Sequence, residues 1–309
     1  ATGNAAPLGL GRDTREPSLE RATDVVSDLV VADDRGPLPL ADAVKQKKAN
    51  GSTYQEWKAS RATEGTVKVS YRMPVARNIT AKRGPVYDLQ AAGGGIAGGY
   101  IGFLVLPDTA GGSFATHVAW KLKPGAMAVS SYGEGDYQGT YTPETLLGTL
   151  FEAGPVNTYR RPGQANDGGV SVYALGLPKD QLKGAGDWTA RADAAEIKAF
   201  QLRDKPYRFM IRSYEGGANP SGRAAENSFL LYVPPGADPN TTMLHHTVAH
   251  EMVHSLAATM DKDQEAGDWY TEGLADYIAM IVPNAAGLYT SQEYAELVGS
   301  ESAGYYTNA

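Results

Sequence analysis

Alternation of hydrophobic and polar positions predicts β-strands through the first two thirds of the chain. Val67, Val69, Tyr71 and Met73 alternate with polar residues, which is typical of a strand with one buried face. The three glycines at 93–95 precede an apolar run instead of a helix, so they predict a turn and not a phosphate-binding loop. Further strands are expected at 100–107, 115–122, 126–132 and 169–177.

After Pro178 the pattern becomes mixed. It predicts helices at 189–200, 241–260 and 271–282, the last ended by Pro283, and strands at 207–214 and 229–233. The expected fold class is therefore α+β. Three parts are expected: a flexible lead-in at 1–20, a β-rich N-terminal domain at 21–185, and an α+β domain at 186–309 that carries the chemistry.

Composition narrows the possible partners. The 309 residues suffice for about two domains, and 42% of them are hydrophobic. The net charge of −7, without a Lys/Arg block, argues against nucleic acid or an anionic membrane as partner. No apolar run reaches the roughly 18 residues of a membrane span. The absence of cysteine excludes disulfides, thiolate metal sites and cysteine nucleophiles. The first residues fit the mature N-terminus of an exported (periplasmic or extracellular) protein, which we expect, or a cut within a longer chain.

A metal-binding pattern lies in the predicted helix at 241–260. His250 and His254 flank Glu251 in the order H-E-x-x-H. Histidines four positions apart share one face of a helix, so both rings can reach a single ion. Glu251 is turned away by about 100° and can approach a metal-bound water without becoming a ligand. The alternative is a polar helix face without a metal. His246, one turn before His250, is expected to face solvent.

The next predicted helix supplies two acidic residues one turn apart, Glu272 and Asp276. A zinc site with two histidines needs a third protein ligand, and a carboxylate is a known choice, which suits Glu272. Asp276 is placed to accept the second ring N–H of a ligating histidine. Glu272 also fits the alternative of a first-turn glutamate that the helix dipole favours.

Together, H-E-x-x-H and the later W-x-x-E-G-x-A-D-Y at 269–277 resemble the gluzincin metallopeptidases, the thermolysin-like group. The resemblance implies a thermolysin-like catalytic domain that holds one Zn²⁺ through His250, His254 and Glu272. It also implies that Glu251 is the general base and that Asp276 supports a ligand. The helical part after Glu272 is shorter than in that group, so the catalytic domain is expected to be short at its C-terminal end, either incomplete as a fragment or short in the natural protein.

Residues 224–227, Ala-Ala-Glu-Asn, resemble the G-x-M-E-N box of the aminopeptidase N-like enzymes and the G-G-L-E-H box of the glycyl aminopeptidase family. In both families the glutamate binds the free α-amine of the substrate, which assigns that role to Glu226. The alternative is a solvated glutamate near a strand end. The chain departs from both families after His254, where Ser255 and Leu256 stand in place of an aromatic residue.

The expected function is a zinc-dependent peptidase that hydrolyses peptide bonds with a metal-activated water, acting as an aminopeptidase at free N-termini of peptides or proteins. An endopeptidase of the same fold and a non-catalytic zinc-containing peptide-binding protein are the alternatives. Gluzincins usually also have a downstream Tyr or His that stabilises the oxyanion. The tyrosines at 289, 294, 305 and 306 all lie earlier than that position, so this residue is not identified.

Overall fold

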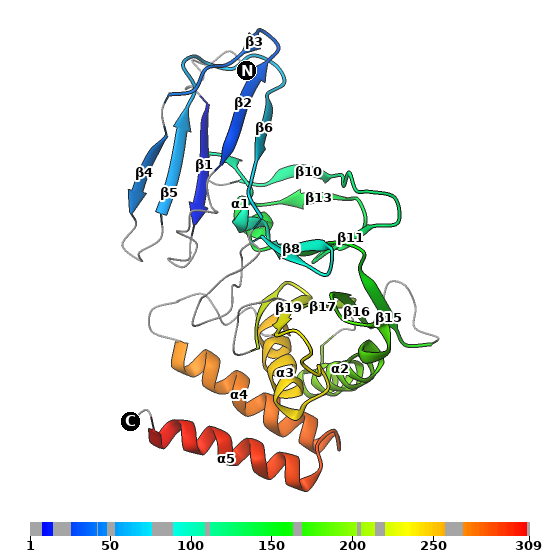
Figure 1. The fold of residues 1–309 in the computed structure, drawn as a ribbon. Helices are drawn as coiled ribbons and strands as arrows, with labels where there is room; N and C mark the ends of the chain where they lie inside the picture. Colours follow the sequence, from blue (N-terminus) through cyan, green and yellow to red (C-terminus); the bar gives the residue numbers. More distant parts are fainter. Residues whose placement is uncertain are drawn as a thin grey trace.

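Layers of β-sheet stacked above a group of helices build the protein, as a computed structural model shows (Figure 1). The structure describes residues 8–14, 26–41, 43–47, 53–75, 89–108, 112–162, 169–202, 205–213, 220–256 and 268–307. One upper sheet has the order β4-β5-β1-β9, and the other has the order β3-β2-β6. Their bounds are β1 Gly9–Thr14, β2 Ser27–Asp33, β3 Gly36–Pro37, β4 Val44–Lys47, β5 Thr53–Lys58, β6 Lys68–Arg72 and β9 Leu106–Pro107.

Beneath the upper sheets lie a middle sheet, with the order β12-β11-β14-β8-β7, and a two-stranded sheet of β10 and β13. The glycines at 93 and 94 turn the chain between β7 and β8 with φ angles of 51° and 80°, which confirms the predicted turn. The bounds are β7 Gln90–Ala92, β8 Gly95–Gly99, β10 Phe114–Val118, β11 Met127–Ser130, β12 Gly133–Glu134, β13 Tyr137–Tyr141 and β14 Leu150–Gly154. Two short helices, η3 Tyr100–Gly102 and α1 Pro143–Leu147, connect strands in this part of the chain.

The lower sheet, with the order β15-β16-β17-β19-β18, carries the helices. Strands β16, β17 and β19 run parallel, and helix α2 forms the crossover between the first two of them. None of the helices in the described ranges combines the length and apolar character that a bilayer span requires. The bounds are β15 Asn157–Arg160, β16 Val170–Leu175, β17 Tyr207–Ser213, β18 Ser221–Ala225, β19 Ser228–Val233, α2 Lys179–Phe200, α3 Thr242–Leu256, α4 Asp268–Ala285 and α5 Ser291–Thr307.

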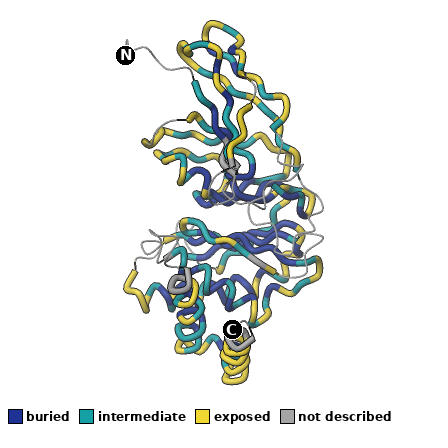
Figure 2. The backbone as a smooth tube through the Cα atoms, turned by 90° about the vertical axis from the view of Figure 1, so that its left-hand side faces the viewer, coloured by how far each residue is buried: buried dark blue, intermediate teal, exposed yellow. Residues whose placement is uncertain are grey.

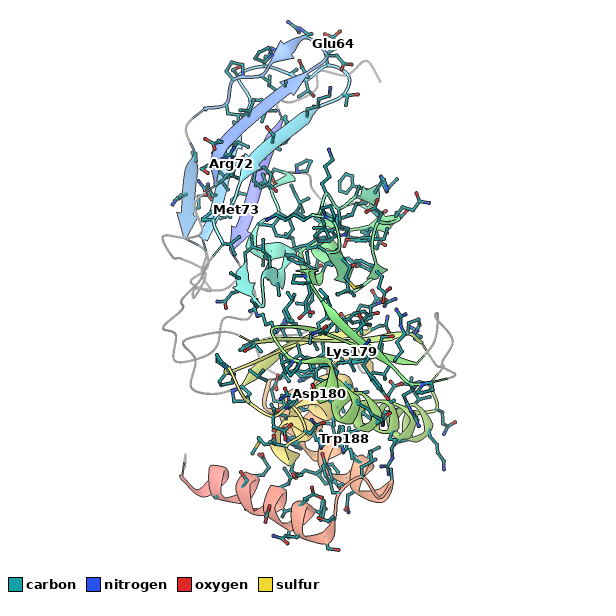
Figure 3. All side chains as sticks on the ribbon, turned by 45° about the vertical axis from the view of Figure 1, so that its right-hand side comes forward. Glu64, Arg72, Met73, Lys179, Asp180 and Trp188 are labelled. Atoms are coloured by element: carbon teal, nitrogen blue, oxygen red, sulfur yellow. The ribbon has the colours of Figure 1, made fainter. Side chains whose placement is uncertain are left out.

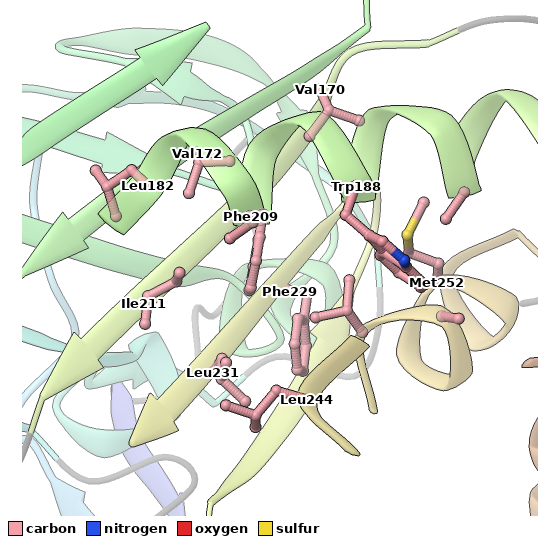
Figure 4. Packing of buried hydrophobic residues seen from close by; sticks show 14 of the residues in the cluster. Val170, Val172, Leu182, Trp188, Phe209, Ile211, Phe229, Leu231, Leu244 and Met252 are labelled. Carbon is pink, nitrogen blue, oxygen red and sulfur yellow. The ribbon is translucent and has the colours of Figure 1, made fainter. Parts of the chain in front are cut away.

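Both faces of the lower sheet are buried, as the dark bands across the centre of Figure 2 show. Phe209 and Phe229 point to the helical side, where they pack with Trp188 of α2 and Met252 of α3 (Figure 4). Tyr173 and Leu230 alternate to the opposite side and pack against the middle sheet. Burial on both faces explains why β16, β17 and β19 are continuous apolar runs in the sequence.

Polar contacts fix the middle sheet on the lower one. Arg208 donates through Nη1 to the carbonyl oxygen of Ser131 at 2.9 Å, and Ser228 donates to the hydroxyl of Ser131 at 2.8 Å. Arg212 is fully buried and donates to the carbonyl of Ala97 at 2.8 Å. Burial raises the pKa of nearby Glu152 well above its usual value, and the positive charge of Arg212 partly offsets that rise.

The α+β fold class is confirmed, and the strands expected near residues 67–73, 115–122, 126–132, 169–177, 207–214 and 229–233 are present. Other expectations are wrong. Residues 9–14 of the supposed lead-in form β1, which pairs with β5 along its length. Residues 100–107 form η3 and the short β9 instead of one strand, because Tyr100 turns inward against Phe103 and Phe151.

The boundary expected between residues 185 and 186 falls inside α2. Strands β15 and β16, which precede that boundary, share the lower sheet with β17, β18 and β19, which follow it. The hydrophobic pattern does not reveal this because parallel strands pair across a helical crossover, far apart in sequence. The lower sheet thus begins at β15, before the expected boundary.

Pro283 does not end the second of the predicted helices. Helix α4 begins at Asp268 and continues through Pro283 to Ala285. A proline inside a helix has no N–H to donate to the carbonyl four residues earlier, here Ala279. The hydroxyl of Tyr289 donates to this carbonyl at 3.3 Å and replaces the missing bond.

The partly buried His245 makes the stability of the helical end of the molecule depend on pH. His245 of α3 stacks on Trp188, with ring centroids 4.3 Å apart and an angle of 3° between the planes. Figure 3 places Trp188 among the lower helices, at the opposite end from Glu64. Burial lowers the pKa of His245 to about 4, although Glu293 and Asp238 favour its charged form.

We expect the wild-type protein to lose stability as the pH falls from about 6.5 to about 4. In this window the unfolded chain binds a proton at residue 245 that the folded chain does not bind. The loss attributable to this residue amounts to about 3 kcal/mol at most. The pH dependence of the unfolding free energy should be weaker by this amount in His245→Phe, which keeps a ring against Trp188. His117→Gln, on the exposed face of β10, is the control. Parallel curves for wild type and His245→Phe would contradict the assignment.

Candidate metal centre

Helix α3 presents the H-E-x-x-H residues at its C-terminal end. Thr241 caps the helix, since its side chain accepts from the backbone N–H of Leu244 at 3.4 Å. His250 and His254 lie one turn apart on the side that packs against α4. Their rings meet edge to face, with centroids 4.7 Å apart.

Three possible ligand atoms converge between α3 and α4. His250 Nε2 lies 3.0 Å from His254 Nε2 and 3.1 Å from Glu272 Oε2, and the third side of this triangle, from His254 to Glu272, is 3.4 Å. Ligands of a tetrahedral zinc ion, with bonds of 2.0–2.1 Å, lie about 3.3 Å apart. This group of His250, His254 and Glu272 has the donor types and spacing of a metal site. Glu272 is 61% exposed at its side chain, so one side of the triangle faces solvent.

Asp276 orients the His250 ring through Nδ1, the nitrogen that faces away from the triangle. Its Oδ1 lies 2.6 Å from His250 Nδ1, which leaves Nε2 directed into the triangle. Burial alone would lower the pKa of His250, but the bond to Asp276 and the surrounding carboxylates outweigh it and raise the pKa. Burial would raise the pKa of Asp276, but the His250 bond lowers it.

His246 is 5% exposed, and its Nε2 lies 3.4 Å from the backbone oxygen of Asp276. The expectation that His246 faces solvent is therefore wrong. The imidazole lies between α3 and α4 because positions 246 and 250 share the helix face that α4 covers. His246 contacts the backbone of the residue whose side chain holds His250.

Glu251 lies on the neighbouring face of α3, toward the edge strand β18. Burial raises the pKa of its carboxyl, and the adjacent His250 and His254 partly offset this rise. The backbone N–H of Ala224 in β18 donates to the Glu251 carboxylate. The proposed base thus touches the strand that carries residues 224–227.

Glu226 lies in the tight turn between β18 and β19, exposed to solvent. Asn227 completes the turn at a φ of 49°, a left-handed conformation that asparagine tolerates better than most residues. The preceding carbonyl, of Ala225, accepts a bond of 3.2 Å from the Ser255 hydroxyl on α3. Tyr207 lies 3.5 Å from the same hydroxyl. Ser255 therefore ties the turn of Glu226 to the helix of the histidines.

A cavity of about 170 Å³ lies beside this turn. Residues 223–226 form one wall, and Ser131, Tyr132, Thr145 and Thr149 of the middle sheet and its connections line the other. The ring of Tyr132 contacts that of Tyr141 at a tilt of 44°, with centroids 4.4 Å apart, and the negative charge of Glu226 raises the pKa of both phenols. The pocket is therefore bounded by residues from both sheets.

The sequence interpretation missed the pocket wall from residues 131–149 and the side chain of Arg223. Nothing in the local pattern places the former beside Glu226, because the two meet only when the sheets stack. Arg223 is detectable in principle, since it directly precedes residues 224–227 and stands at the first position of the G-x-M-E-N box. Tyr289, one candidate for an oxyanion-stabilising residue, is buried against Trp188 at the far end of α4. Tyr294 packs against the same core, and the side chains of Tyr305 and Tyr306 lie outside the described residues.

The chain matches no protein-family model and no curated protein. Similar solved structures include a mutant of a two-domain M1 zinc metallopeptidase bound to L-arginine, with 17% identity and a TM-score of 0.45 over 85% of this chain and 64% of that chain. Native leukotriene A4 hydrolase from Saccharomyces cerevisiae has 12% identity and a TM-score of 0.49 over 97% and 46%. An M1 zinc metallopeptidase mutant from Deinococcus radiodurans bound to Tyr-Ser-Ala has 16% identity and a TM-score of 0.44 over 84% and 63%. The chain thus spans between 46% and 64% of these three structures.

Proposed function

We propose that the chain is a zinc-dependent peptidase that removes residues from free N-termini. The observation that carries this proposal is the triangle of His250 Nε2, His254 Nε2 and Glu272 Oε2. Glu251 is the neighbour of His250 in the chain and is not one of the three ligand residues. Two imidazoles, one carboxylate and an open fourth position suit catalytic zinc. A purely structural site would need no adjoining base.

Zinc bound by these three residues would lower the pKa of a water toward about 7 and polarise the carbonyl to be cleaved. The chain's own groups supply the remaining chemistry. The Glu251 carboxylate takes a proton from the attacking water and returns it to the nitrogen of the leaving amine. The hydrogen bond to Asp276 keeps the proton of His250 on Nδ1, so that Nε2 stays available as a donor atom.

Glu226 is proposed to bind the α-ammonium of the substrate. The Ser255 bond fixes the turn that carries Glu226 against the helix of the metal site, and Glu251 touches the same strand through Ala224. An ammonium ion held at Glu226 places the first peptide bond, and no later one, beside the base. Charge-assisted hydrogen bonds of this kind are roughly twice as strong as neutral ones.

Wild-type protein with zinc is expected to hydrolyse aminoacyl-arylamides, and Glu226→Ala should lower kcat/KM for them by about 10- to 100-fold. Peptides with an acetylated N-terminus cannot offer an ammonium ion, so their slow cleavage should hardly change. The measurement is kcat/KM for each substrate, together with the zinc content of every sample. Glu301→Ala, an exposed position of α5, is the matched control.

Each outcome of this experiment identifies a different function. Efficient cleavage of the blocked peptides, with equal losses for both substrates in Glu226→Ala, would indicate an endopeptidase. Stoichiometric zinc without turnover of any peptide would indicate a zinc-containing peptide-binding protein. Absence of bound zinc would reject the proposal as a whole.

A further inference from the structure

Two opposite charges line the pocket beside the turn between β18 and β19. Glu226 and Arg223 are both exposed at its wall, three positions apart on the β18–β19 hairpin. In the G-x-M-E-N box that residues 224–227 resemble, the first position is glycine, and here it is Arg223. The chain therefore has a cation where the box has no side chain.

Strand geometry sets the direction of this cation. Arg223 pairs with Leu230 across the β18–β19 ladder, and cross-strand partners share one face of a sheet. Leu230 packs against Val129 and Leu150 of the middle sheet. Arg223 thus emerges on the face that looks toward the middle sheet, into the pocket, and its charge also acts on Glu251.

We propose that Arg223 makes this site select substrates whose N-terminal residue is aspartate or glutamate. The inference rests on the proposed function, in which Glu226 holds the α-ammonium. An N-terminal acidic residue carries an ammonium and a carboxylate a few bonds apart, which complements an anion and a cation on one pocket wall. The guanidinium has five N–H donors, so it can bind a substrate carboxylate besides its contacts within the protein.

The opposite wall of the pocket includes small hydroxyl-bearing residues and the ring of Tyr132. Ser131, Thr145 and Thr149 bring hydroxyl groups to the opposite wall, whereas large aliphatic side chains are absent from the lining among the described residues. An N-terminal lysine would put a like charge beside Arg223, which disfavours it. A neutral residue would gain nothing from the guanidinium.

The test compares glutamyl-arylamide with glutaminyl-arylamide, which differ in charge and hardly in shape. Wild-type kcat/KM should be about tenfold higher for the glutamyl substrate, and the ratio should fall as salt screens the exposed pair. Arg223→Ala should bring the ratio close to one. Arg223→Glu should reverse the preference, favouring lysyl- over glutamyl-arylamide. Arg191→Ala, an exposed arginine of α2, should keep the wild-type ratio.

A reversed preference cannot result from misfolding, because a misfolded variant loses both substrates alike. A wild-type ratio of one or less, or an unchanged ratio in Arg223→Ala, would overturn the inference. Binding of the dipeptides Glu-Ala and Gln-Ala, measured by calorimetry on zinc-loaded Glu251→Gln protein, separates it from the proposed function. If Glu251→Gln protein binds Glu-Ala more tightly than Gln-Ala but the wild type cleaves no peptide, the selectivity is supported and the peptidase proposal is rejected. If Glu251→Gln protein binds both dipeptides equally and the wild type cleaves other peptides, the selectivity is rejected and the peptidase proposal is supported.

Discussion

Glu251→Gln protein is expected to bind zinc as the wild type does and to lose about 10²- to 10⁴-fold in kcat for aminoacyl-arylamides. The amide keeps the shape of the side chain but cannot take a proton from the attacking water. It can still accept the backbone N–H of Ala224 through its carbonyl oxygen, so the contact between α3 and β18 survives. A loss in kcat without a loss of metal is thus the specific result.

Zinc content and single-turnover kinetics on the same sample provide the measurement. Glu296→Gln, where the glutamate accepts from Gln292 on the surface of α5, controls for the change from acid to amide. If Glu251→Gln retained wild-type kcat, Glu251 would not be the base. If it lost zinc as well, the carboxylate would belong to the metal site.

Removal of a proposed metal ligand should have an equally large effect on zinc binding. Glu272→Ala is expected to reduce bound zinc from about one ion per chain to almost none after dialysis, because two imidazoles alone leave a tetrahedral site half formed. Asp276→Asn should act more mildly, weakening zinc affinity by about 10- to 100-fold, since it disturbs only the partner of His250 Nδ1.

Competition with a chromophoric chelator measures both affinities, and a map of anomalous scattering at the zinc edge locates the ion. The order of affinities, wild type above Asp276→Asn above Glu272→Ala, is what the geometry requires. Undiminished zinc binding in Glu272→Ala would show that the triangle between α3 and α4 is not the metal site.

The grouping of His250, Glu251, His254, Glu272 and Asp276 is predictable from sequence because most of it is local. His250, Glu251 and His254 lie within one and a half turns of α3, and helix periodicity alone determines which of them share a face. Glu272 and Asp276 are related by the same spacing on α4. Only the pairing of the two helices had to be assumed, and the structure shows them packed together.

Features that depend on contacts between distant elements cannot be predicted from local sequence patterns. The apolar run at 100–107 has the hydrophobicity of a strand, but Tyr100 is buried in an aromatic cluster and the chain turns there. Pro283 is a helix breaker by its own chemistry, yet the Tyr289 hydroxyl compensates for its missing donor. The pocket beside Glu226 has walls from two sheets, and no periodicity links them.

The hydrogen bonds of Ser131 limit how the shape of this pocket can change between related proteins. Its carbonyl and hydroxyl are both engaged by the lower sheet, through Arg208 and Ser228, while Ser131 itself borders the cavity. Two hydrogen bonds thus hold the two walls together at the edge of the pocket. The pocket cannot widen by a shift of the middle sheet over the lower sheet unless both hydrogen bonds break. Relatives with other preferences should therefore differ by replacements at single lining positions, with the spacing of the layers retained.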